Sequence, residues 1–112
     1  MTLPKLYRKL ELEEAQRSPD GAGGYTQTWV TLGTLWADMR PRTGNEKVGD
    51  LQSVSGASWR IIVRASPAGS ASRPRPEQRF REGSRLFHIL AVTEFDPTSH
   101  YLTCYAREEV VT

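Results

Sequence analysis

Residues 58–65 read Ser-Trp-Arg-Ile-Ile-Val-Arg-Ala. Trp59, Ile61 and Val63 alternate with Arg60 and Arg64, and successive side chains of a β-strand point to opposite faces. The stretch therefore predicts a strand with one apolar face and one charged face.

The same two-residue period continues on both sides of this stretch, and no segment has the 3.6-residue period of a strong helix. Near the N-terminus, for example, Leu10 and Leu12 share a face while Glu11 and Glu13 point the other way. Clusters of glycine and proline separate the periodic segments, as expected for turns. Further strands are expected at 5–15, 25–41, 78–82, 85–95 and 101–111.

About six short strands joined by turns predict an all-β fold, either a barrel or a sandwich. We favour a small β-barrel forming a single domain over residues 1–112, because closure removes the exposed edges of a short sheet. Two long polar loops are expected, at 42–57 and at 66–76. The second is rich in Ser, Arg and Pro, and we expect it to be a flexible basic arm.

The composition argues against several classes of protein. The 112 residues include one cysteine, which cannot form an internal disulfide, and the net charge is only +2. No apolar run approaches the length of a membrane helix, and no apolar leader follows the first residues. We therefore expect a soluble protein that folds in a reducing cytosol and makes no membrane contact.

Two groups of residues could in principle carry catalysis, and each has a simpler explanation. Alternating charges on the outer face of a strand account for the acidic pairs. A small buried thiol is ordinary on a terminal strand. We therefore expect no catalytic, cofactor-binding or metal-binding residues. The groups considered are Glu11, Glu13 and Glu14 with Glu108 and Glu109, and Cys104 with His88 or His100.

The three tryptophans could stack on single-stranded bases or pack within the protein. Trp36 and Trp59 each lie among alternating apolar residues, so we expect both in the core. Trp29 follows a glycine-rich turn, and we expect it to contact a neighbouring subunit, since aromatic residues are enriched at interfaces.

Arginine is the strongest signal outside the predicted core. Six arginines fall within residues 64–85, a segment with only two acidic residues. Arginine suits both carboxylate pairing and phosphate binding. We expect contacts to acidic protein neighbours ahead of contacts to DNA, with the following residues in that role: Arg73, Arg75, Arg79 and Arg81.

The order of motifs resembles the head–tail joining (stopper or head-completion) family of long-tailed phages, which also occurs in phage-like gene transfer agents. The most specific part is Gly-Gly-Tyr at 23–25, Trp29, and then Leu-Trp-Ala at 35–37 before Pro41. The late Gly83 and the Leu-Phe-His-Ile-Leu run at 86–90 follow in the same order. The segment 66–76 departs from the family by being longer and more basic.

The resemblance implies a non-enzymatic connector at the neck of a virion or phage-like particle, assembled in the bacterial cytoplasm. The subunits would form a ring, a hexamer in preference to a dodecamer, that closes the DNA channel after packaging. The portal or adaptor protein would lie above it, the tail terminator or tail tube protein below it, and packaged double-stranded DNA inside it. The loop 42–57 would face the channel through Arg42, Asn45, Glu46, Lys47, Asp50 and Gln52.

The alternative is a nucleic-acid-binding barrel of the OB type. It would hold single strands on Trp29, Tyr25 and the arginine-rich segment. Tight binding of short single strands by the isolated protein would favour this reading.

Overall fold

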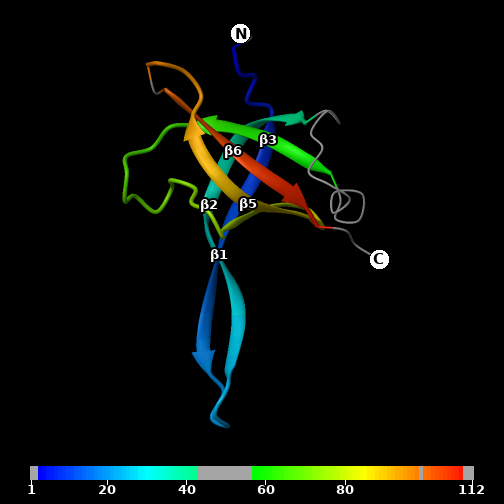
Figure 1. Cartoon of the computed structure of the whole chain (residues 1–112), viewed down its shortest axis with the longest axis vertical. Helices are drawn as coiled ribbons and strands as arrows, with labels where there is room; N and C mark the ends of the chain where they lie inside the picture. Colours follow the sequence, from blue (N-terminus) through cyan, green and yellow to red (C-terminus); the bar gives the residue numbers. More distant parts are fainter. Residues whose placement is uncertain (1–2, 43–56, 99, 110–112) are drawn as a thin grey trace.

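The computed structural model describes residues 3–42, 57–98 and 100–109. These residues contain six strands, all antiparallel to their neighbours, and the strands close into a barrel in the order β1-β2-β3-β6-β5-β4 (Figure 1). The all-β prediction is confirmed, and the barrel rather than the sandwich is the correct form. The strands are β1 (Arg8–Pro19), β2 (Tyr25–Pro41), β3 (Ser58–Arg64), β4 (Arg79–Glu82), β5 (Arg85–Glu94) and β6 (Tyr101–Glu108).

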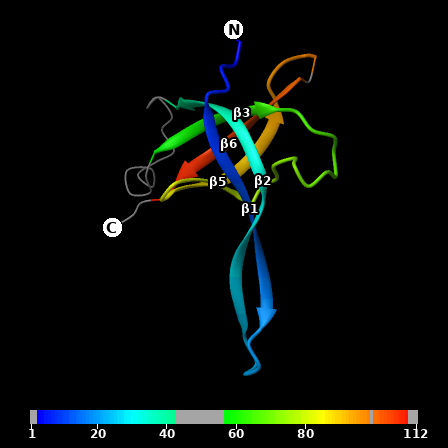
Figure 2. The same cartoon turned by 180° about the vertical axis from the view of Figure 1, so that it is seen from behind.

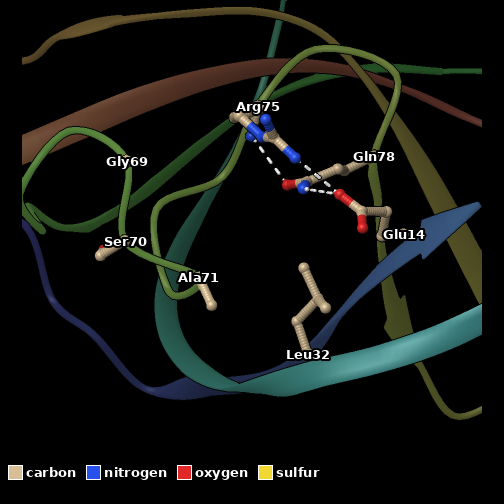
Figure 3. Close-up of a pocket in the computed structure, with 7 residues that line it drawn as sticks. All are labelled: Glu14, Leu32, Gly69, Ser70, Ala71, Arg75 and Gln78. Carbon is tan, nitrogen blue, oxygen red and sulfur yellow. Dashed lines mark hydrogen bonds and ion pairs between the residues drawn. The ribbon is translucent and has the colours of Figure 1, made fainter.

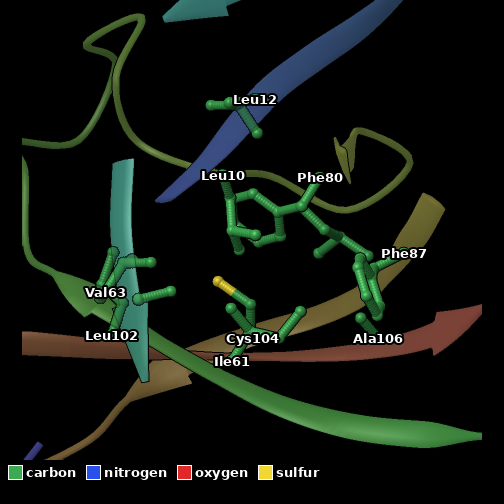
Figure 4. Close-up of a cluster of buried hydrophobic side chains, with 11 residues drawn as sticks. Leu10, Leu12, Ile61, Val63, Phe80, Phe87, Leu102, Cys104 and Ala106 are labelled. Carbon is green, nitrogen blue, oxygen red and sulfur yellow. The ribbon is translucent and has the colours of Figure 1, made fainter. Parts of the chain in front are cut away.

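Most core residues occupy alternate, inward-facing positions of the strands (Figure 4), and β3 is an exception because Ile61, Ile62 and Val63 are all buried. Phe80 and Phe87 are cross-strand partners on β4 and β5, and both are fully buried. Cys104 lies among the core residues, as expected for a small apolar thiol. The other members of the buried cluster are Leu10, Leu12, Ala37, Ile61, Val63, Ile89, Leu102 and Ala106.

The distal halves of β1 and β2 project from the barrel as a long hairpin (Figures 1 and 2). The register shifts between Leu12 and Glu13, where Leu12 pairs with Gly33 but Glu13 pairs with Thr31. Leu32 is therefore the extra residue of a β-bulge, a feature that bends a strand and increases its twist. The bulge marks the place where the two strands leave the barrel.

The hairpin turn is organised by Asp20. Its carboxylate accepts hydrogen bonds from the backbone N–H groups of Ala22 (2.8 Å) and Gly24 (3.0 Å). Gly21 and Gly23 adopt positive φ angles of 83° and 88°, which glycine allows without a steric penalty. The two N–H donors lower the pKa of Asp20, so the turn carries a negative charge at neutral pH.

Two side-chain predictions for the strands are wrong. Trp36 is 53% exposed, because Ala37 occupies the inward position and its neighbours on β2 must point outward. The nearly continuous apolar run at 86–92 predicts a strand covered on both faces, but Leu90 is also largely exposed. Leu90 is the extra residue of a second bulge, since Ile89 pairs with Ala106 and Ala91 with Tyr105. Trp59 was predicted to lie in the core, and it does pack against the core, although it remains partly exposed.

The segment 66–76 was expected to be a flexible arm that could not pack on the domain, and this expectation needs correction. Pro74 is fully buried. The Arg73 guanidinium donates to the Ser66 carbonyl (2.8 Å), and the Arg75 backbone N–H donates to the Gln78 side chain (2.8 Å). The loop is thus anchored by internal hydrogen bonds and one buried ring, despite its low apolar content.

Candidate functional site

An ion-paired surface lies where the acidic strand β1 meets the basic strand β4. The two strands are antiparallel, with Glu11 opposite Arg81 and Glu13 opposite Arg79. Arg79 Nε lies 2.7 Å from Glu13 Oε1, and Arg81 lies 3.0 Å from the other oxygen of the same carboxylate and 3.1 Å from Glu11. Glu13, predicted as a solvated outward charge, is only 3% exposed, because these guanidinium groups cover it.

The loop before β4 extends this surface toward the base of the hairpin. Arg75 lies 2.6 Å from Glu14, and Gln78 Nε2 donates to the same carboxylate oxygen at 3.1 Å. We call the combined set the paired face. It comprises Glu11, Glu13, Glu14, Arg75, Arg79 and Arg81.

A pocket of about 190 Å³ opens beside the paired face, beneath residues 69–71 and next to Leu32 (Figure 3). Its polar lining comprises Ser70 and the network of Glu14, Arg75 and Gln78. The Arg75 and Gln78 side chains both donate to the Glu14 carboxylate, so much of the polar capacity of this lining is used within the chain.

Trp29 joins the paired face instead of standing alone. The Arg79 guanidinium carbon lies 3.9 Å from the centre of the Trp29 ring, within cation–π range. The His88 ring meets the indole edge-on at 6.1 Å, and His88 Nε2 lies 2.7 Å from Glu109. One face of the indole is therefore occupied within the chain, and its predicted contact with a neighbouring subunit stays a prediction.

A second ionic network closes one end of the barrel. Arg8 binds both oxygens of Glu82 at 2.7 and 2.6 Å, and Arg85 binds Glu108 at 2.8 and 3.1 Å. The Trp59 indole N–H also donates to Glu108, at 3.1 Å. Hydrogen bonding to arginine lowers the pKa values of both glutamates and raises those of the two arginines.

The acid–base and nucleophile arrangements considered from sequence are not assembled. Cys104 is fully buried, and loss of solvation raises the pKa of its thiol to about 12, so it carries no thiolate at neutral pH. Glu108 and Glu109 do not form an acid–base pair with each other, since Glu108 is bound to Arg85 and Glu109 to His88. In the described part of the chain, no cluster of His, Cys, Asp or Glu could hold a metal ion, and no helix could span a membrane.

The residues predicted to contact partners have varied positions. Arg75, Arg79 and Arg81 all engage glutamates of β1, and Arg73 holds its own loop. The arrangement gives no support to the OB-type alternative, since Trp29 and these arginines are already engaged.

Of the channel-loop residues, Arg42 donates its backbone N–H to Ser58 and places its guanidinium over the Tyr105 ring. The others lie outside the described residues: Asn45, Glu46, Lys47, Asp50 and Gln52.

The sequence reasoning missed a second group of arginines, on the outer side of β2, β3 and β6. Arg60 and Arg64 were predicted to point away from the core, and they do, but no role was assigned to them. Strand alternation was the signal available, since it placed both cations and Trp36 on outward positions.

These features define a class: a small closed all-β module whose polar groups are organised for packing and recognition. The phage head completion protein family matches residues 1–109, and the chain belongs to it. The family consists of structural virion proteins, and the resemblance read from the sequence is confirmed.

Two solved structures are similar. One is a chain in the virion of a native gene transfer agent particle, with 52% identity and a TM-score of 0.81. That match covers 98% of this chain and all of the other. The second is the solution structure of protein SF1141 from Shigella flexneri 2a, with 19% identity and a TM-score of 0.72 over the full length of both chains, which shows a shared fold. A comparison with curated proteins found no match.

Proposed function

We propose that this protein is a connector subunit that completes the head of a phage or gene transfer agent particle. Copies assemble as a ring, a hexamer in preference to a dodecamer, beneath the portal or adaptor protein. The ring closes the DNA channel after packaging and offers its lower face to the tail terminator or tail tube protein. The observation that carries the proposal is the 52% identity, over nearly the whole chain, to a protein found in a gene transfer agent virion.

The channel-closing part of the proposal assigns the loop 42–57 to the pore. Its polar residues suit a wet channel, and both of its ends are held by the barrel. Pro41 pairs with Trp59, and the Arg42 N–H donates to the Ser58 carbonyl at 2.9 Å. Shortening the loop between these fixed ends should change the stability of the barrel little, because closure entropy changes slowly with length.

Complementation tests the function as a whole. Particles produced without this chain should contain heads that lose DNA and lack tails, and the wild-type gene should restore both properties. Tailed, DNA-filled particles in the absence of the chain would contradict the proposal.

A deletion tests the channel loop. Removing residues 46–53 should leave the unfolding transition close to that of wild type, while packaged heads leak DNA. Replacing the same residues with a Gly/Ser segment of equal length is the matched control that separates length from side-chain chemistry. Normal DNA retention by the deletion variant would remove the loop from the closure mechanism.

A further inference from the structure

The outer side of β2, β3 and β6 forms a second arginine-bearing surface. These three strands are hydrogen-bonded neighbours. Arg40, Arg60 and Tyr105 lie in one row across them, and Arg64 lies opposite Tyr101 in another. Trp36 precedes Ala37, the partner of Val63, so it lies level with Arg64. We call this set the arginine–aromatic face. It comprises Trp36, Arg40, Arg60, Arg64, Tyr101 and Tyr105.

The fold leaves positive charge on this face. Within the described residues, Arg60 and Arg64 form no ion pair, whereas the glutamates of β1 are bound to other arginines. Arg40 binds Asp38 at 3.0 Å, yet it also stands directly opposite Arg60. Like charges in a cross-strand pair destabilise a sheet. Within the described residues no ion pair with a carboxylate offsets this local cost at Arg60, which is typical of a surface shaped by binding.

Aromatic side chains accompany the charge. Arg64 lies over the Tyr101 ring at 5.9 Å, and the Trp36 indole is 53% exposed. Tyr7, which immediately precedes β1 beside this part of β2, is 77% exposed. Trp, Tyr and Arg are the residue types that most often dominate the binding energy of protein interfaces.

We infer that the arginine–aromatic face docks an acidic protein surface of a neighbouring virion component. The partner supplies carboxylates to Arg60 and Arg64 and an apolar site for Trp36. Double-stranded DNA fits less well. Its bases are stacked and covered, and its phosphates are bound by cations alone, so large aromatic surfaces such as the Trp36 indole contribute little to binding it. The inference rests on the proposed function and adds the chemistry of the partner.

The test uses heads produced without this chain and purified protein added to them, with binding measured by co-sedimentation. Arg64→Glu should weaken binding about tenfold, since reversing the charge places two carboxylates together. Arg17→Glu is a matched control, because Arg17 is also an exposed arginine over a tyrosine ring (Tyr25, 5.4 Å) and undergoes the same charge change. Arg17→Glu should bind within about twofold of wild type.

The outcomes distinguish failure of the proposed function from failure of the docking inference. Wild-type protein that does not bind these heads would contradict the proposed function. Wild-type binding with an unaffected Arg64→Glu variant, or with equal loss in both variants, would overturn the docking inference alone. A third arm titrates a duplex of about 30 base pairs over a range of salt concentrations. Steeply salt-dependent duplex binding that Arg64→Glu abolishes would make the face a phosphate site and overturn the protein-partner inference.

Discussion

The paired face and the arginine–aromatic face use the same cation in opposite settings. On the paired face, β4 brings Arg79 and Arg81 opposite the acidic side chains of β1, and the charges are neutralised inside the chain. On the arginine–aromatic face, β3 brings Arg60 opposite Arg40 and Tyr105. Strand register alone therefore decides whether an arginine stabilises the fold or is left available to a partner.

The largest expected difference between the faces is in stability. Arg79→Ala removes a partner of the nearly buried Glu13 carboxylate and the cation over Trp29. We expect a loss of about 2–3 kcal/mol in the free energy of unfolding, with Arg81 retaining part of the interaction. Arg64→Ala should cost under ~0.5 kcal/mol, as is usual for an exposed side chain. Urea denaturation of the two variants measures both values, and equal losses would remove the distinction.

The pH dependence of stability gives a second, smaller difference. The folded-state pKa values of Glu82 and Glu108 lie below the ordinary value of 4.5. Their ionised forms therefore stabilise the fold fully above about pH 4.5, and this stability is lost as the pH falls through the lowered values.

The variant Glu108→Gln should lower the free energy of unfolding by about 1 kcal/mol at pH 7. Its free energy of unfolding should also fall less steeply than that of wild type as the pH is lowered. Its matched control is Arg60→Gln, which should keep the wild-type slope because Arg60 binds no carboxylate in the described part of the chain. Urea titrations at pH 7 and pH 3 provide the comparison. An unchanged slope for Glu108→Gln would show that this barrel end does not govern acid stability.

The smallest expected effect has the opposite sign. Arg60→Glu places a carboxylate opposite Arg40 and should raise the free energy of unfolding by ~0.5 kcal/mol through a favourable cross-strand pair. The same change should weaken attachment to heads. If Arg60→Glu is more stable but attaches to heads less well, docking and folding depend on Arg60 in different ways. A destabilised variant would instead show that Arg60 supports the fold.

Strand positions were largely predictable because they depend on local alternation. The expected segments 25–41 and 58–65 correspond to β2 and β3, and the bulge residues Leu32 and Leu90 lie where the period of two is interrupted. The environment of the arginines was not predictable in the same way. Arg79 and Glu13 are separated by 66 positions in the chain, and only barrel closure brings them together.

The density of arginine in the sequence therefore does not by itself identify the arginines that lack an ion pair within the chain. The run at 73–81 contains residues that the fold engages internally, while Arg60 and Arg64 stand among apolar residues of β3 and attracted no functional assignment. An arginine's outward position on a strand, considered together with the charges on the two neighbouring strands, indicates better whether the arginine is paired within the chain.

Hydroxyl-radical footprinting of the free protein and of complete particles measures whether assembly covers the arginine–aromatic face. Trp36 reports on the arginine–aromatic face, and His88, whose side chain is 38% exposed, lies beside the paired face. We expect assembly to protect Trp36 strongly from oxidation and to leave His88 nearly unchanged. Equal oxidation of Trp36 in the free protein and in particles, or protection of His88 alone, would contradict it.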